Sequence, residues 1–448
     1  MLPEQEKCKM INNLVKISLI LFCCSVSNTF SRSEPFILGA DISWIPQREA
    51  GGVRYADNGT VKDIFEILGD YRFNYIRLRL FVDPTATVPG ESESPYSRQG
   101  YCGLESTLQM AKRVKDAGMK FLLDFHYSDT WADPGKQHKP MSWRELNFNQ
   151  LTEKVRSYTR ETLERFEQEG VLPDMVQVGN EVVGGMIWPD GRNSNMSNFA
   201  TLVNAGIDGV KDVDENILIM IHTIAERNPN NWLTSLKNAG VNRIDVFGLS
   251  YYEEWHGTVS DLRSMVNAIA ANHNEKIVVV EYSEQHRSVN DVIFDLPNNQ
   301  GMGTFVWEPC DWRDVLLTWR NNRRETNEKI HLYPVMSQEY GNDDFGDKVS
   351  TGDNDYPFTL YQGITSQSDK FLFSSDNGVL RYFSDDPATV SMFTFKGRLV
   401  GQCQIKSPGI YHPAFDISGT STVQSGRYVL IIDSRGQQRK VFTTQFFR

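Results

Sequence analysis

Short apolar runs alternate with amphipathic stretches along most of the chain. Eight of the runs have the length and the alternating or β-branched composition of buried strands. They cover Phe36–Ile42, Tyr75–Phe81, Lys120–His126, Asp174–Glu181, Ile217–His222, Asp245–Tyr252, Lys276–Glu281 and Gly303–Trp307. Between them, apolar residues recur at helical spacing in Val61–Leu68, Leu104–Ala117, Leu151–Gln168, Phe199–Val210 and Val259–Asn272. Gly118 and Gly170 stand just past two of these stretches, where glycine commonly ends a helix.

Strand–helix alternation of this kind predicts parallel strands joined by right-handed crossovers, and eight units predict a closed barrel. A doubly wound open sheet is the alternative, but no glycine-rich phosphate loop follows the first strand. We therefore expect an α/β protein whose residues 34–338 form a (β/α)8 TIM barrel.

The alternation of strand and helix patterns ends after Trp312. Arg320–Lys329 has the charge of a surface helix or loop, and the acidic residues 339–357 predict a linker. Short apolar runs separated by turns then predict a small all-β, sandwich-like module over residues 358–448. Its end, SGRYVLIIDSRGQQRKVF, resembles the C-terminal sorting domains of bacterial type IX secretion. We expect the module to serve export, anchoring or glycan binding.

The N-terminus has the pattern of a secretory signal. Leu14–Val26 is a short apolar run behind several lysines, too short for a comfortable membrane span and without a polar face. We expect residues 1–33 to be a signal peptide and disordered N-terminus rather than a buried first helix. Cys23 and Cys24 leave lipid attachment open, so the expected location is secreted or cell surface.

The net charge limits the classes of binding partner that the chain can have. The net charge of −11 argues against nucleic acid, and against a membrane beyond surface anchoring. We expect a monomer.

Only Cys102, Cys310 and Cys403 remain after the leader, so the chain is no disulfide scaffold. Cys102 and Cys310 follow strands two and eight, whose loops open on the same face, and they form either a bridge or two free buried thiols.

Polar residues gather at the tails of the predicted strands. The C-terminal end of such a barrel is where an active site lies, so residues far apart in sequence meet there. These residues are Asp41, Trp44, Arg77, Arg79, Asp124, His126, Asn180, Glu181, His222, Tyr251, Tyr252, Glu281, Trp307 and Glu308.

Glu181 and Glu281 end strands four and seven, which face each other across the barrel. Two carboxylates on opposite sides of a sugar can cleave a glycosidic bond, and a separation of about 5–5.5 Å gives retention through a covalent intermediate. One carboxyl must hold a proton while the other is ionised. The alternative for each glutamate is an ion-paired or surface role.

Tryptophans form a second group at the strand ends. Sugar C–H faces stack on indole rings, so such a group suits a polysaccharide, although each ring alone is more often plain packing. Its members are Trp44, Trp131, Trp188, Trp255, Trp307 and Trp312.

Metal and serine chemistry find little support. His126, Asp129 and His138 do not have zinc-ligand spacing, the acidic run Glu339–Asp355 does not match a calcium loop, and no G-x-S-x-G elbow occurs. We expect no cofactor.

Five long motifs resemble glycoside hydrolase family 53, the arabinogalactan endo-β-1,4-galactanases. They are LLDFHYSDTWADPGKQHKP (Leu122–Pro140), VQVGNEVVGGMIWPDG (Val176–Gly191), GLSYYEEWHGT (Gly248–Thr258), VVVE (Val278–Glu281) and GTFVWEP (Gly303–Pro309). The resemblance implies a retaining endo-acting barrel that cleaves the β-1,4-galactan of type I arabinogalactan in pectin.

By motif, the resemblance makes Glu181 the acid/base and Glu281 the nucleophile of a double displacement. It also matches Arg79, His126, Asn180, Tyr251 or Tyr252, and Trp307 to positions that line the reacting-sugar subsite. With the strand-tail residues and the tryptophans, the residues expected to bind substrate are Asp41, Arg79, Asp124, His126, Trp131, Asn180, Trp188, Tyr251, Tyr252, Trp255 and Trp307. The chain departs from the family after Glu281 (YSEQHR) and after Pro309 (CDW), which affects subsite layout. The calcium of some family members cannot be assigned. Another barrel endo-glycanase such as a β-mannanase, or a non-catalytic carbohydrate-binding barrel, is the alternative.

Overall fold

The structure is a computed structural model of the 448-residue chain. It describes residues 32–226 and 228–342, and seven strands between residues 371 and 446. The predicted signal peptide therefore lies almost wholly outside the described residues, and most of the predicted linker does too. No helix in the described parts of the chain is long and apolar enough to cross a membrane.

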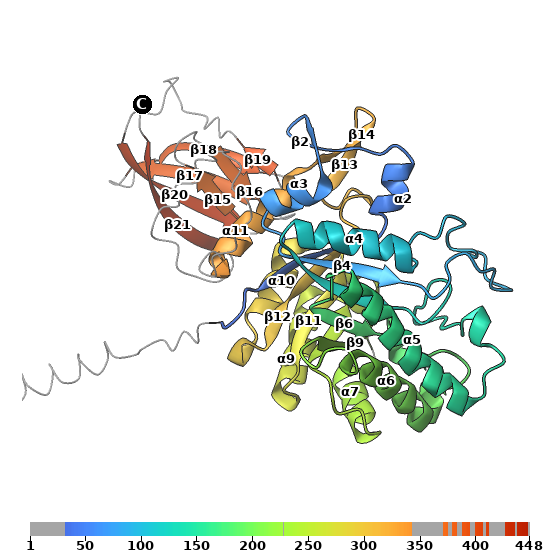
Figure 1. The fold of residues 1–448 in the computed structure, drawn as a ribbon. Coiled ribbons are helices and arrows are strands. Elements are labelled where there is room, and N and C mark those ends of the chain that lie inside the picture. The colour runs from blue at the N-terminus through green and yellow to red at the C-terminus, as the bar shows by residue number, and fades with distance from the viewer. Residues whose placement is uncertain are drawn as a thin grey trace, which may run out of the picture. The chain divides into compact units, whose positions relative to one another are not determined.

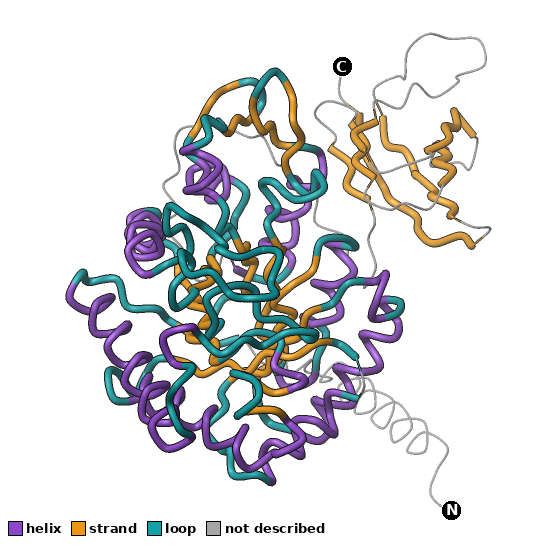
Figure 2. The backbone as a smooth tube through the Cα atoms, turned by 90° about the vertical axis from the view of Figure 1, so that its right-hand side faces the viewer, coloured by secondary structure: helices purple, strands orange, loops and turns teal. Residues whose placement is uncertain are grey.

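Eight parallel strands close into a barrel, and their order around it follows their order in the chain. Helices cover the outside of this barrel (Figure 1, Figure 2). All eight predicted strands are confirmed, with small shifts at their ends. The barrel strands are β1 (Ile37–Asp41), β4 (Tyr75–Leu80), β5 (Lys120–Phe125), β6 (Met175–Val178), β9 (Leu218–Ile224), β10 (Val246–Ser250), β11 (Lys276–Tyr282) and β12 (Gly301–Trp307).

The helices follow the expected amphipathic stretches. The 21-residue α5 begins at a capping box, in which Asn147 and Gln150 satisfy each other's backbone N–H groups. The helices are α2 (Ile45–Ala50), α3 (Ile64–Asp70), α4 (Leu104–Asp116), α5 (Phe148–Gln168), α6 (Met196–Lys211), α7 (Pro229–Asn238), α8 (Glu253–His256), α9 (Val259–Asn272), α10 (His286–Phe294) and α11 (Leu332–Glu339).

Two sequence expectations are wrong in the loops beside the barrel. The stretch expected to be a helix from Val61 begins as a strand, and α3 starts only after Asp63, whose carboxylate accepts the Phe65 N–H at 2.8 Å. The charged run from Arg320 is a β-hairpin, because Asn321 and Asn322 both take left-handed backbone angles that make a two-residue turn. The two loops meet in one four-stranded sheet of β2 (Tyr55–Asp57), β3 (Thr60–Lys62), β13 (Leu317–Arg320) and β14 (Arg323–Thr326).

The barrel interior is apolar at its N-terminal end and polar at its C-terminal end. Because side chains alternate along a strand, the residue two positions after an inward apolar side chain also faces inward. Met175 precedes Gln177 in this way, and Met220 precedes His222. The apolar plug consists of Ile37, Tyr75, Leu122, Met175, Met220, Val246, Val278, Val280 and Phe305. It closes the bottom of the barrel and leaves the polar side chains to converge at the top.

The end of the barrel unit is tied to its beginning. The side chain of Asn342 accepts the backbone N–H of Phe36 at 2.7 Å and donates to its carbonyl at 2.9 Å. Tyr340 stacks on Phe294 with ring centroids 4.3 Å apart. Because of these contacts, α11 and the residues up to Asn342 pack as part of the barrel unit.

The described strands of the C-terminal region pair into two antiparallel sheets, which agrees with the expected all-β module. One sheet has the order β15–β16–β19 and the other β18–β17–β20–β21. The strands are β15 (Phe371–Ser374), β16 (Val379–Tyr382), β17 (Ala388–Thr394), β18 (Leu399–Ile405), β19 (Gly409–Tyr411), β20 (Gly426–Ser434) and β21 (Gln437–Phe446).

Candidate active site

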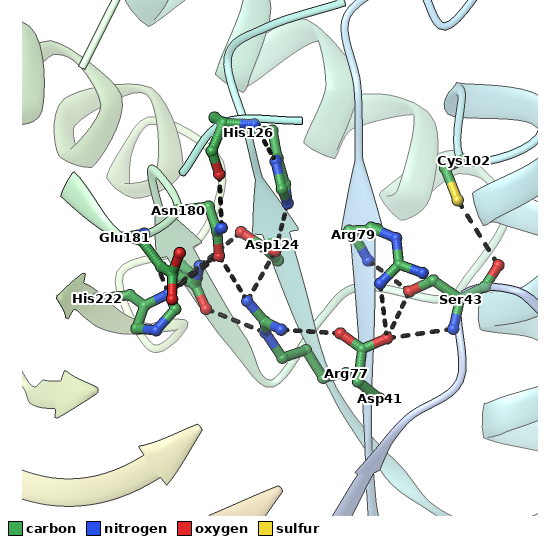
Figure 3. A network of polar contacts seen from close by, with 12 residues as sticks. Asp41, Ser43, Arg77, Arg79, Cys102, Asp124, His126, Asn180, Glu181 and His222 are labelled. Atoms are coloured by element: carbon green, nitrogen blue, oxygen red, sulfur yellow. Dashed lines mark hydrogen bonds and ion pairs between the residues drawn. The ribbon is translucent and has the colours of Figure 1, made fainter. Parts of the chain in front are cut away.

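Arg77, an inward residue of β4, organises the polar end of the barrel (Figure 3). Its side chain is 1% exposed. The guanidinium donates to Asp41 Oδ2 (2.8 Å), Glu281 Oε1 (2.8 Å), Asp124 Oδ2 (2.9 Å), Asn180 Oδ1 (2.8 Å) and Gln177 Oε1 (3.2 Å). Burial lowers the pKa of Arg77, but the three carboxylates more than offset this and raise it overall. Arg77 is therefore a fixed cation that holds residues from the ends of four other strands in one layer.

Glu281 faces this layer because of an irregularity in β11. Val278 and Val280 already face the barrel interior, so strict alternation would turn Glu281 outward. The register of β11 shifts at this point against both neighbouring strands, and the shift re-aims the side chain. Glu281 then accepts hydrogen bonds from Arg77 and from the Tyr252 hydroxyl at 3.0 Å. Burial raises the pKa of Glu281, and these two donors oppose the shift.

Glu181 lies beyond the end of β6, where the chain enters the short 3₁₀ turn Val182–Gly184. Its backbone is left-handed (φ 46°, ψ 48°), an uncommon conformation for a residue with a side chain. Burial and the nearby Glu281 carboxylate raise the pKa of Glu181 to about 8, and a hydrogen bond from Ser250 opposes this. A strained backbone and a raised pKa at one residue mark a candidate functional carboxyl.

The two glutamates are held in opposite states by their surroundings. Glu281 receives a charge-assisted hydrogen bond from Arg77, which favours its ionised form. The side chain of Glu181 is hydrogen-bonded by Ser250, which is uncharged, and faces the charge of Glu281. This arrangement favours an ionised Glu281 beside a protonated Glu181, whose pKa is raised to about 8.

Asn180 and His126 are fixed beside Arg77. Asn180 donates to the Ala132 carbonyl at 2.8 Å, which directs its side-chain oxygen to Arg77. His126 accepts the Ala132 N–H at its Nδ1 (3.2 Å), so its Nε2–H donates to Asp124 at 3.0 Å. Arg77 and His126 outweigh burial and hold the pKa of Asp124 at about 2.

A second ion pair lies beside the first layer, between Arg79 and Glu308. Arg79 donates to Glu308 and, at 3.4 Å, to Asp41. Its guanidinium lies 4.8 Å from the ring centre of Trp131 and 5.5 Å from that of Trp44. Burial raises the pKa of Glu308 to about 8, against the opposing effect of Arg79. Arg79 is thus held between two aromatic rings and two carboxyl groups.

The predicted tryptophans fall into separate groups. Trp44 and Trp307 pack edge to face at 5.3 Å, and Trp312 lies 5.0 Å from Trp307. Trp188 donates its indole N–H to the Gly184 carbonyl and is covered by Arg192 at 3.9 Å. Their rings are half-buried, as a sugar-stacking surface requires.

In the loop after β10, the side chains of two neighbouring tyrosines that the sequence could not distinguish have different partners. Tyr252 reaches Glu281, whereas Tyr251 is buried and donates to the Gly257 carbonyl at 2.9 Å. Trp255 lies 5.2 Å from Tyr252 and is 63% exposed. The structure therefore brings Tyr252 to the glutamates and turns Tyr251 away from them.

Five residues of the site were not among the predicted catalytic and substrate-binding residues. Arg77, His222 and Glu308 were predicted only to lie at the strand tails, and Gln177 and Ser250 were not predicted at all. The period of two along β6 and β10 would have found them, since Gln177 follows inward Met175 and Ser250 follows Gly248.

The remaining sequence candidates have structural partners. Cys102 and Cys310 are free buried thiols, so the alternative of a bridge between them is wrong. Cys102 lies 3.5 Å from the Tyr96 hydroxyl and 3.6 Å from the Ser43 carbonyl. His138 contacts Glu91 at 3.2 Å, away from His126. Within the described residues, no group of three or more His, Cys, Asp or Glu residues could hold a metal ion.

Comparison with known proteins gives the same assignment along the barrel. The family model described as glycosyl hydrolase family 53 matches residues 37–292. A Niallia circulans protein named "Uncharacterized protein in bgaB 5'region" is 41% identical, over 62% of this chain and 85% of that protein. The endo-beta-1,4-galactanase of Bacillus subtilis is 32% identical, over 62% of this chain and 71% of that protein.

A solved structure is similar as well. The Ignisphaera aggregans GH53 catalytic domain superimposes with a TM-score of 0.60 at 28% sequence identity, covering 68% of this chain and 97% of that domain. The family model spans more than half of the chain, and the barrel superimposes on that GH53 catalytic domain. The chain belongs to glycosyl hydrolase family 53.

Proposed function

We propose that this protein is a retaining endo-β-1,4-galactanase in which Glu181 is the acid/base and Glu281 the nucleophile. One observation carries the proposal: two strand-end glutamates share one site but have opposite electrostatic surroundings. Glu281 is hydrogen-bonded to Arg77 and Tyr252, while burial and Glu281 raise the pKa of Glu181 to about 8. A double displacement needs one ionised and one protonated carboxyl, and this pair supplies both at neutral pH.

In the first step, Glu281 attacks the anomeric carbon as the bond to the leaving oxygen breaks. Glu181 gives its proton to that oxygen, and the sugar becomes an ester of Glu281. Loss of this proton leaves Glu181 ionised, so it can take a proton from the incoming water in the second step. Water then replaces Glu281 and restores the original anomeric configuration.

The side chains fixed by Arg77 have a part in binding the reacting sugar. Asn180 is oriented by Ala132 and Arg77, so its amide has a defined direction toward a sugar hydroxyl. Asp41 and Asp124 carry charge at the base of the site, and Arg79 lies between Trp44 and Trp131. Polar anchors beside half-buried indoles are what a polysaccharide chain needs.

The choice of galactan rests on relatives, because several of them are named for it. The Bacillus subtilis relative is an endo-beta-1,4-galactanase, and a Cellvibrio japonicus relative is an arabinogalactan endo-beta-1,4-galactanase at 31% identity. By this reasoning the substrate is the β-1,4-galactan of pectin side chains. The leader-like N-terminus supports secretion or surface display, where such a polymer is met. We propose that the enzyme acts as a monomer without a cofactor.

Reducing-sugar release from purified potato galactan, mannan and arabinan tests the substrate. Galactan alone should release oligosaccharides, with a mixture of lengths from the start because cleavage is internal. Release from mannan instead would favour a β-mannanase with the same catalytic pair. No release from any polymer, with binding retained, would favour a non-catalytic carbohydrate-binding barrel.

A further inference from the structure

Beneath Glu181 lies a buried imidazole whose two nitrogens have different partners. His222 is fully buried on β9. Its Nδ1 lies 3.3 Å from the backbone nitrogen of Glu181 and 3.1 Å from Nε2 of Gln177. The backbone N–H of Glu181 is directed at Nδ1, which assigns Nδ1 as the acceptor and the ring proton to Nε2, although the Asn180 side-chain oxygen also lies 3.0 Å from Nδ1. Burial and Arg77 lower the pKa of His222, which keeps the ring neutral.

The Nε2–H of His222 then fixes a serine hydroxyl. Nε2 lies 2.8 Å from Oγ of Ser250, which is fully buried at the end of β10. A hydroxyl that accepts from an N–H is free to donate its own proton elsewhere. Ser250 makes a side-chain hydrogen bond with Glu181 that lowers the pKa of Glu181, as a donor to the ionised carboxylate does.

We propose that Ser250 and His222 are positioning residues that form a closed ring of hydrogen bonds with Glu181 and tune its proton affinity. The backbone N–H of Glu181 donates to His222, His222 donates to Ser250, and Ser250 donates to the Glu181 carboxyl group. Each donor fixes the next, so the ring leaves Ser250 a single direction for its proton. This inference rests on the proposed acid/base role of Glu181.

The ring accounts for how Glu181 can serve in both steps. Ser250 holds one carboxyl oxygen and leaves the other for the glycosidic oxygen or the water. Once Glu181 has given up its proton, the hydrogen bond from Ser250 strengthens because the acceptor has become charged. Ser250 therefore keeps the pKa of Glu181 from rising further under burial, so that proton release remains accessible.

Other charged groups around Glu181 act from different strands. Glu281 on β11 and Asp133 in the loop after β5 raise its pKa, and Arg77 on β4 lowers it. Tyr252, which follows β10, has its own pKa raised by burial and by both glutamates. None of these groups changes when Ser250 alone is replaced, so a shift in that variant reports the ring.

The tautomer of His222 tests the ring without any need for activity. The full chain labelled with ¹⁵N-histidine gives long-range ¹H–¹⁵N spectra, in which the His222 signals are identified by their loss in His222→Gln. We expect a neutral ring with its proton on Nε2 at neutral pH, because burial and Arg77 lower its pKa. A proton on Nδ1, directed at the Asn180 oxygen 3.0 Å away, would overturn the ring.

The pH profile of kcat/KM then tests its effect on Glu181. In Ser250→Ala the alkaline limb should move upward by about 0.5–1 pH unit, because a donor to the ionised form is lost. Ser250→Thr keeps a hydroxyl and should restore the limb. Thr223→Val is the matched control, since Thr223 is buried on the same strand as His222 and its hydroxyl has no hydrogen-bond partner among the described residues.

The two experiments separate the ring from the proposed function. An unaltered enzyme that cleaves no glycan would refute the function, while the tautomer would still decide whether the ring exists. An alkaline limb that stays in place in Ser250→Ala, or moves equally in Thr223→Val, would overturn the tuning of Glu181.

Discussion

At the residue scale, Arg77 determines which glutamate is ionised. Among the described residues it is the one cation that hydrogen-bonds to Glu281, and it also binds Asp41 and Asp124. Three carboxylates around one buried arginine leave an excess of negative charge. This excess disfavours a further ionised carboxyl group, and the charge of Glu281 raises the pKa of Glu181. The proposed division of roles therefore follows from the hydrogen bond between Arg77 and Glu281.

Glu181→Ala should separate substrates by their leaving groups. Cleavage of galactan should fall by about 100-fold or more, the usual contribution of general acid catalysis. Cleavage of an aryl β-galactobioside with an acidic phenol should lose far less in its first step, because that leaving group departs without a proton. Steady-state and burst kinetics on both substrates measure this. Equal losses on the two substrates would mean that Glu181 is not the acid.

Arg77→Lys should slow the enzyme and shift its acid limb. Lysine cannot make the five hydrogen bonds of the guanidinium, and loss of one charge-assisted bond corresponds to a factor of roughly 10–100 in rate. Because Arg77 opposes the raised pKa of Glu281, its replacement should raise that pKa and move the acid limb of kcat/KM to higher pH. Arg113→Lys, at the half-exposed pair with Glu49, is the control. An unmoved acid limb would show that Arg77 does not set the ionisation of Glu281.

At the element scale, the division between plug and site is built into the strands. Inward positions of period two carry apolar side chains first and polar ones last, and inward side chains from alternate strands stack in layers. Gly39 on β1 leaves the space that the ring of Phe305 fills, because a Cβ at Gly39 would overlap that ring. Such packing fixes the height at which the polar layer begins.

Gly39→Ala should destabilise the barrel without touching the glutamates. Overpacking of this kind costs about 1–3 kcal/mol, which thermal or denaturant unfolding measures. Phe305→Leu in the same chain should recover part of the loss, since a smaller side chain vacates the space, and the pair should be non-additive. Gly51→Ala, where no ring is near, is the comparison. Additive effects of the two changes would contradict the direct contact.

Periodicity in the sequence predicted the strands well and their edges less well. The eight barrel strands carry apolar runs because helices and plug bury both of their faces. The hairpin of β13 and β14 is charged and half exposed, so it resembled a loop, and its Asn321–Asn322 turn was the missed signal. The start of α3 was misplaced because Val61 is an exposed strand residue rather than part of a helix face.

At the scale of the whole molecule, the barrel unit has all of the proposed catalytic groups. Its chain runs from Phe36 to Asn342, and the hydrogen bonds between these two residues tie its ends together. The C-terminal strands pair among themselves in two sheets. We therefore expect that catalysis does not depend on the C-terminal region, which we propose serves sorting or anchoring.

A chain that ends at Asp355 should keep full turnover per mole on a short soluble galacto-oligosaccharide. It retains Asn342, whose contact with Phe36 is needed for the barrel unit. Circular dichroism and thermal unfolding check that the barrel is folded. A large loss of turnover by a folded barrel would show that the C-terminal region helps to build the site.

The sequence identified the candidate catalytic glutamates but could not specify what surrounds them. Glu181 and Glu281 were found because a charged residue at the end of an apolar strand is conspicuous. The five partners of Arg77 come from four strands, and no local pattern specifies which side chains meet. The choice between Tyr251 and Tyr252 depended on a backbone turn after β10, and the turn of Glu281 toward the site depended on the register shift in β11.

Trapping of the covalent intermediate tests the central claim most directly. A 2-deoxy-2-fluoro-β-galactobioside with an activated leaving group slows the second step, so the glycosyl ester should accumulate. Peptide mass spectrometry should then find one fluorinated disaccharide per chain, attached to Glu281, and none in Glu281→Ala. An adduct on Glu181 or any other residue, or inactivation-free turnover with inverted products, would contradict the assignment.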